Sequence, residues 1–257
     1  MKKLALSCAI AASMMAFASA AQADTISLRG DAWCPYNCDP KDKNPGYMIE
    51  IAKEVFEKAG HTVDYQTLTW ARTLEQVKAG EFTAAVGAAV EDAPELVFGK
   101  LPLGNSSNTF AVRADDTFAY KDLTSLDTKA LGVINGYAYT QEINDYIEKN
   151  KANPKKIQAA SGDDARATNF NKLVAKRIDM IVDDGNVLSN YILSAKLEGK
   201  AKVIDSPLPS SKVYLAFSPA NPKSKEYVEL LDKGVEEMRK SGKLATILAK
   251  YGVKDWQ

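Results

Sequence analysis

Residues 46–68, GYMIEIAKEVFEKAGHTVDYQTL, contain a helix pattern followed directly by a strand pattern. Residues 46–60 place apolar side chains on one helical face and end on a glycine, which is typical of an amphipathic helix. Residues 61–68 form a predicted strand, and residues 25–31 (TISLRGD) alternate as a strand does. Strands that alternate with helices are typical of a mostly parallel sheet. The predicted buried face of the helix consists of Met48, Ala52, Val55, Phe56 and Ala59.

The same alternation of strands and helices continues along the chain. It runs through residues 61–115 and then restarts at residue 130. Because the second block repeats the pattern of the first, the sequence predicts two α/β lobes. A last strand and two helices are predicted at residues 212–219, 224–242 and 244–252.

The first residues have the composition of a secretory signal peptide. Lys2 and Lys3 precede the apolar segment Leu4–Ala18, and residues 21–23 (AQA) are small enough for a signal peptidase. We therefore expect cleavage after Ala23 and export to the periplasm. No later segment is long and apolar enough to span a bilayer, so we expect no direct insertion into the membrane.

Two cysteines remain after export, and three residues separate them. In an oxidising compartment, Cys34 and Cys38 are expected to form a disulfide. A structural zinc site needs four ligands, and His61 is the one histidine of the sequence. A thioredoxin-like motif has two intervening residues rather than three. The disulfide is predicted to fix how Trp33 and Tyr36 leave the first strand.

The composition excludes several classes of partner and cofactor. Basic and acidic residues number 33 each, so no excess of positive charge favours nucleic acid or an anionic membrane as partner. Apolar residues make up 46% of the chain, which is ample for a core. Since no phosphate-binding loop, catalytic triad or metal cluster is evident, we expect no cofactor and no metal. A monomer is the expected oligomeric state.

Several segments, in the right order, resemble the periplasmic solute-binding proteins of polar amino acid ABC transporters (bacterial extracellular solute-binding proteins, family 3). The resemblance covers essentially all of the mature chain. TWARTLEQVKAGEFT, residues 69–83, is similar to a segment that marks a divergent branch of the family. The segments that carry the resemblance are residues 46–60, 68–87, 131–143, 176–193 and 240–252.

The resemblance implies a type II periplasmic-binding-protein fold, in which two crossing strands join two α/β lobes and a ligand binds between them. It places lobe 1 at residues 24–113 and 213–257 and lobe 2 at residues 114–212, after the signal peptide at residues 1–23. It also implies the capture of a small polar solute, an amino acid or a related amine-bearing compound, and delivery to a membrane ABC permease. A soluble partner of a membrane receptor is an alternative, and a lyase similar to cyclohexadienyl dehydratases is a less favoured one. We expect a binding protein rather than an enzyme.

The same resemblance places aromatic residues in the cleft. Trp33 and Tyr36 would line it, and Trp70 would stack on the ligand. Packing in the core is the alternative for the tryptophans, because Trp70 begins a stripe of apolar residues at helical spacing. Arg72 would clamp a carboxylate if it faced the cleft, and it would otherwise be a surface residue.

The second lobe would supply charge and backbone donors. Asp184 matches the acidic position that accepts the amino group of a ligand in the family; capping of the helix that follows is the alternative, and both roles could hold at the same time. Tyr137 and Tyr139 begin a helix whose backbone N–H groups would face a carboxylate. The full set of expected ligand-binding residues is Asp31, Trp33, Tyr36, Trp70, Arg72, Ala89, Glu91, Ser107, Tyr137, Tyr139 and Asp184.

One segment departs from the family pattern. In residues 86–100, Ala89 and Glu91 stand where the family has threonines, and Pro94 stands where it has the arginine that binds a carboxylate. Either Arg72 or another basic residue replaces this arginine, or the ligand is not an ordinary α-amino acid. Glu91 and Asp184 together favour a cationic or multiply hydroxylated ligand.

Overall fold

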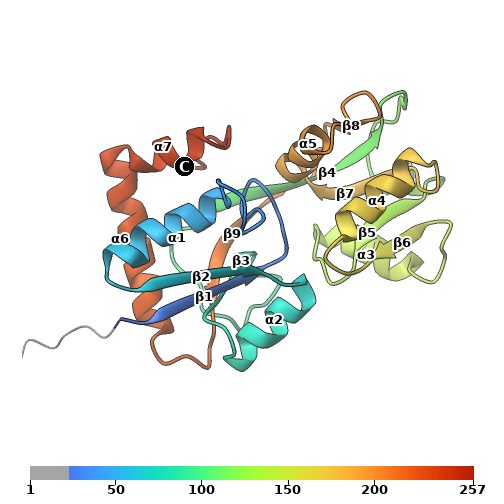
Figure 1. Ribbon diagram of the computed structural model, residues 1–257. Coiled ribbons are helices and arrows are strands. Elements are labelled where there is room, and N and C mark those ends of the chain that lie inside the picture. Colours follow the sequence, from blue (N-terminus) through green and yellow to red (C-terminus); the bar gives the residue numbers. More distant parts are fainter. Residues whose placement is uncertain (1–22) are drawn as a thin grey trace, which may run out of the picture.

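The computed structural model describes residues 23–257 and shows two α/β lobes joined by two strands (Figure 1). The two-lobed architecture predicted from the sequence is therefore confirmed. The predicted signal peptide, residues 1–23, lies outside the described residues apart from Ala23. Among the described residues, no helix has the length and apolar character needed to cross a membrane.

The first lobe is a sheet with helices on both faces. Its elements are β1 (Thr25–Gly30), α1 (Tyr47–Lys58), β2 (Thr62–Thr67), α2 (Trp70–Ala79), β3 (Ala84–Ala88), β9 (Ser210–Phe217), α6 (Ser224–Ser241) and α7 (Lys243–Ala249). β1 pairs in parallel with β2 and with β3, and β9 pairs antiparallel with β3. Helices α1, α6 and α7 pack on one face of this sheet, and α2 packs on the other.

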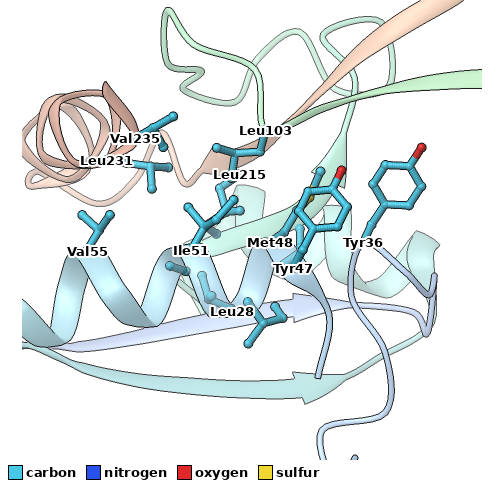
Figure 2. Packing of buried hydrophobic residues seen from close by; sticks show 14 of the residues in the cluster. Leu28, Tyr36, Tyr47, Met48, Ile51, Val55, Leu103, Leu215, Leu231 and Val235 are labelled. Atoms are coloured by element: carbon cyan, nitrogen blue, oxygen red, sulfur yellow. The ribbon is translucent and has the colours of Figure 1, made fainter. Parts of the chain in front are cut away.

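The core of the first lobe forms where α1 meets the sheet and α6. Figure 2 shows Leu28 of β1, Ile51 and Val55 of α1, and Leu231 and Val235 of α6 in one cluster. Each of these side chains is nearly or fully removed from water. Burying a side chain of this size contributes roughly 1.5–3 kcal/mol, so this cluster orients α1 and α6 on the sheet.

The predicted apolar face of α1 is confirmed at four positions and wrong at one. Met48, Ala52, Val55 and Phe56 are buried, but Ala59 is exposed. The helix ends at Lys58, so Ala59 already belongs to its C-terminal cap and no longer follows the helical face.

The second lobe repeats the arrangement with shorter strands. Its elements are η1 (Leu123–Leu126), β5 (Leu131–Ile134), α3 (Gln141–Asn150), β6 (Ile157–Ala160), α4 (Ala165–Val174), β7 (Met180–Asp184), α5 (Gly185–Ser194) and β8 (Ala201–Ile204). β5 pairs in parallel with β6 and with β7. Because the parallel strands share a direction, their carboxyl ends and the loops that follow meet at one edge of the sheet.

Two strands connect the lobes. β4 (Gly104–Arg113) pairs with β9 over Gly104–Ser107, and its second half, from Asn108, pairs with β7 and β8 of the second lobe. The alternating sequence of residues 109–115 identifies a strand but not its pairing partner. We therefore propose to place the boundary of the first lobe near residue 107 rather than at residue 113.

Candidate functional site

A cavity of about 330 Å³ lies between the two lobes, and the loops that follow β1, β3 and β5, together with the end of β7, form much of its wall. Open α/β sheets bind ligands at such carboxyl ends of strands. The first lobe contributes Asp31, Trp33, Trp70, Ala89, Glu91 and Asp92. The second lobe contributes Tyr137, Tyr139, Thr140, Gln141, Asn144 and Asp183. The crossing strands contribute Ser106, Asn108, Ser211 and Val213.

The loop after β1 is closed by the predicted disulfide, which is confirmed between Cys34 and Cys38. The rings of Trp33 and Tyr36 stack with their centroids 4.1 Å apart. Trp33 lies on the cavity wall, and its indole N–H donates to Oδ1 of Asp183 in the other lobe at 3.1 Å. Tyr36 is 1% exposed and lies behind Trp33, outside the cavity wall. The disulfide loop thus presents one aromatic ring to the cavity and supports it with a second.

Asp184 has the capping role that the sequence offered as an alternative. Its Oδ1 accepts hydrogen bonds from the backbone N–H groups of Asn186 and Val187, at 2.8 and 3.0 Å, at the start of α5. Its Oδ2 accepts from Ser107 N at 2.9 Å and lies 3.1 Å from the Tyr36 hydroxyl. A carboxylate has about four acceptor positions, and these donors occupy them. Asp184 is not among the residues that line the cavity, and its contact with a ligand stays a prediction.

The neighbouring Asp183 faces the cavity and pairs with an arginine. Nε of Arg166 lies 3.0 Å from Oδ2 of Asp183, and the two side chains are 11% and 2% exposed. Arg166 is the second residue of α4, and its Nη1 also donates to the carbonyl oxygen of Ala32 in the first lobe at 2.6 Å. The ion pair therefore fixes Asp183 and also joins the lobes.

A second contact between the lobes runs through Tyr137. Its hydroxyl donates to Oδ2 of Asp31 in the first lobe and accepts from Nη2 of Arg166 at 3.2 Å. Burial raises the pKa of Asp31, while Arg166 and Tyr137 act in the opposite direction. Asp31, Tyr137, Arg166 and Asp183 consequently form one connected polar network across the cavity.

Most other residues of the predicted set lie on the cavity wall, and two do not. Arg72 is exposed on α2 and is not a wall residue, whereas Trp70, 8% exposed, both lines the cavity and packs against Val77. Ser107 is not a wall residue, while its strand neighbours Ser106 and Asn108 are. The remaining predicted residues on the wall are Asp31, Ala89, Glu91, Tyr137 and Tyr139.

Sequence reasoning missed Arg166, Asp92 and Asp183 as site residues. Asp92 follows Glu91 in the loop after β3, and its Oδ2 accepts from Ala89 N at 2.8 Å. Burial raises the pKa of Asp92 to about 6, and the neighbouring Glu91 adds to the effect. Strand alternation at the end of β7 would have separated Asp183 from Asp184. Nothing in the local sequence marks Arg166, because its partners come from distant segments.

The start of α3 also faces the cavity. Thr140 is the N-cap residue, yet its side chain makes no capping hydrogen bond. Its Oγ1 is buried on the wall without a hydrogen-bond partner among the described residues. A helix N-terminus carries roughly half a positive charge, so this end of the cavity favours an acceptor group.

Solved structures with this fold include several solute-binding proteins. One is an ancestral arginine-binding protein bound to arginine, with 20% identity, a TM-score of 0.72, and coverage of 88% of this chain and 97% of that chain. Another is an ABC uptake transporter substrate-binding protein from Streptococcus pneumoniae with bound histidine, with 19% identity, a TM-score of 0.71, and coverage of 88% and 92%. A third comes from work on glutathione import through the cystine ABC importer of Streptococcus mutans, with 17% identity, a TM-score of 0.73, and coverage of 90% and 95%. At these identities, the similarity shows the fold, a type II periplasmic-binding-protein fold.

The family of this chain is identified from its sequence. A search among curated proteins gives no match. The family described as bacterial extracellular solute-binding proteins, family 3, matches residues 28–254, which is nearly all of the described chain. The resemblance noted from the ordered segments is thereby confirmed, and this chain belongs to family 3 of the bacterial extracellular solute-binding proteins.

Proposed function

We propose that this protein captures a small polar solute between its lobes in the periplasm and delivers it to an ABC transporter. The observation that carries the proposal is that both lobes supply walls of one cavity. A solute held there contacts both lobes and so stabilises the arrangement in which they meet. Membership of the family and the predicted signal peptide at residues 1–23 support the export and the transport role.

The contacts between the lobes support capture by closure. They come from side chains at the cavity, namely Trp33 with Asp183, Tyr137 with Asp31, and Arg166 with the Ala32 carbonyl. Each of these groups regains water when the lobes separate, so each bond is worth only a modest net free energy, about 0.5–3 kcal/mol. The equilibrium between separated and closed lobes is therefore within the range that a bound solute can shift.

A thermal-shift screen followed by calorimetry tests the capture step. The screen covers amino acids, amines, small peptides and organic acids. A true ligand at 100 times its Kd stabilises the folded protein by about 2.7 kcal/mol. Ala138→Trp adds bulk at an exposed position of the cavity wall and is expected to abolish this stabilisation. Ala195→Trp, at an exposed position outside the cavity wall, serves as the matched control.

The delivery step needs a separate measurement. The ligand found by the screen is labelled, and its uptake by membrane vesicles that contain the permease is measured with and without this protein. Uptake that depends on the protein supports delivery. In a pull-down from membranes, recovery of a receptor instead of a permease would indicate the sensor alternative. Chemical conversion of the ligand would indicate a lyase. A screen without any stabilising solute contradicts the proposed function.

A further inference from the structure

The walls of the cavity carry an excess of negative charge. Four carboxylates line it: Asp31, Glu91, Asp92 and Asp183. The first lobe contributes Asp31, Glu91 and Asp92, and the second lobe contributes Asp183. Among the described residues that form the walls, none is a lysine, arginine or histidine.

Arg166 contacts the wall residue Asp183, and each of its guanidinium nitrogens already has a hydrogen-bond partner. Its Nε binds Asp183, its Nη1 binds the carbonyl oxygen of Ala32, and its Nη2 binds the Tyr137 hydroxyl. It is also mostly buried behind the wall. Arg166 therefore pairs directly with Asp183, also acts on Asp31 through its charge, and does not offer its guanidinium to a ligand.

The remaining carboxylates have weaker compensation. Asp31 accepts from the neutral hydroxyl of Tyr137, and Asp92 accepts from the backbone N–H of Ala89. Glu91 makes no hydrogen bond or ion pair to another described residue and is exposed at the wall. Hydrogen bonds from neutral donors stabilise a carboxylate without cancelling its charge. The cavity consequently keeps a net negative charge that a positive ligand would relieve.

The other positions at which a positive charge was expected do not change this balance. Arg72 is exposed and lies outside the wall, and Pro94, which stands where the family has an arginine, is uncharged. The N-terminus of α3, at Thr140, contributes only about half a charge. Aromatic faces add to the preference, because Trp33, Trp70 and Tyr137 lie on the same walls and π-faces attract cations.

We propose that the cavity selects an organic cation that carries amine or guanidinium groups and lacks a carboxylate. This inference rests on the proposed solute-binding function and names the chemical class of the solute. An α-carboxylate would enter a cavity whose walls already carry carboxylates, with no side-chain cation on the wall to receive it. An amine or guanidinium group instead pairs with Glu91 and Asp92, while Thr140 Oγ1 and the backbone N–H groups at the start of α3 donate to a neutral acceptor group of the ligand.

Pairs of compounds that differ only by the carboxylate test the proposal. Calorimetry compares agmatine with arginine, cadaverine with lysine, and histamine with histidine. We expect at least one amine to bind, and to bind at least tenfold more tightly than its amino acid. Equal or tighter binding of the amino acids overturns the proposal. Binding of only neutral or acidic solutes in the wider screen also overturns it but leaves the proposed function intact, whereas no binding of any solute overturns both.

A single substitution then tests the charge directly. Glu91→Gln keeps the shape of the side chain and is expected to weaken binding of the amine by about threefold to tenfold, with the melting temperature of the free protein unchanged. Glu81→Gln, at an exposed position of the same lobe outside the wall, is the control and is expected to leave affinity unchanged. Equal affinities of the two variants would remove Glu91 from the site and contradict the proposal.

Discussion

Asp183 and Asp184 are neighbours in the sequence and have different environments. Asp183 points to the cavity and to Arg166, while Asp184 points to α5 and Tyr36. This division follows from the alternation of side chains along β7. Of these two carboxylates, Asp183 is thus the one that lines the cavity, and Asp184 is the one that caps α5.

The stability of the protein should depend on pH through Asp184. Burial, with Asp183 adding to it, raises the pKa of this carboxyl from its ordinary value to about 6. The folded state then holds a proton that the unfolded state releases between about pH 4 and 6. The free energy of unfolding therefore falls as the pH rises through this window, by up to about 3 kcal/mol from this group.

Urea unfolding of the wild type and Asp184→Asn at pH 4.5 and 7 measures this effect. The amide cannot titrate, so the destabilisation caused by the substitution should be smaller at pH 7 than at pH 4.5. Asp205→Asn, at an exposed position, controls for the chemical change. The same destabilisation at both pH values would contradict the prediction.

Arg166 should be important for stability because its partner is buried. Arg166→Met leaves Asp183 without its ionic partner in a site where the carboxylate is 2% exposed. Removing one partner of such a pair typically costs about 3–5 kcal/mol. The double variant Arg166→Met/Asp183→Asn should cost less than the sum of the two single variants in urea unfolding. Simple additivity would show that the two side chains are not coupled.

At the scale of elements, the sequence was enough to predict strands and helices from their periodicity. It was not enough to predict, for every strand, which side chains face the cavity. The apolar face of α1 follows from its own sequence, since the residues that it buries recur at helical spacing. For β4, the sequence indicates a strand, yet Ser106 and Asn108 face the cavity rather than Ser107. Which side of a crossing strand faces the cavity depends on its pairing with β9 and β7, which no local pattern encodes.

The disulfide loop is the element with the most direct effect on the cavity. Replacing Cys34 and Cys38 by serine removes a very short loop closure, which costs about 2 kcal/mol at most. The larger effect should be on ligand affinity, because Trp33 and Tyr36 lose their fixed stacking. Calorimetry should show weaker binding in a variant that still unfolds cooperatively. An unchanged affinity would mean that the loop holds its shape without the covalent bond.

At the scale of the whole molecule, the least predictable feature is the network between the lobes. Asp31 and Tyr137 are more than one hundred positions apart, and Arg166 comes from a third segment. Their meeting depends on the relative placement of two lobes, which is set by β4 and β9. The family resemblance predicted a cleft at this place, but it did not predict which side chains would bridge it.

Tyr137→Phe isolates the contribution of one such bridge to closure. The variant loses the hydrogen bond to Asp31 in the other lobe, and bonds to charged groups are worth about 1.5–3 kcal/mol. We expect ligand affinity to fall by roughly tenfold and small-angle scattering to show incomplete compaction at a ligand concentration that saturates the wild type. Tyr146→Phe removes a hydroxyl that bonds to Leu126 within the second lobe and should leave affinity unchanged. Equal affinity of the wild type and Tyr137→Phe would contradict a role for this bridge.

The hydrogen bond from Trp33 to Asp183 gives the molecule its own optical reporter. The sequence contains three tryptophans, and two of them, Trp33 and Trp70, lie on the cavity wall. When the lobes separate, the indole of Trp33 exchanges a carboxylate partner for water, so the fluorescence emission shifts toward longer wavelength. Stopped-flow fluorescence can therefore follow opening and closing in the unlabelled protein, with Trp33→Phe as the variant that removes the signal.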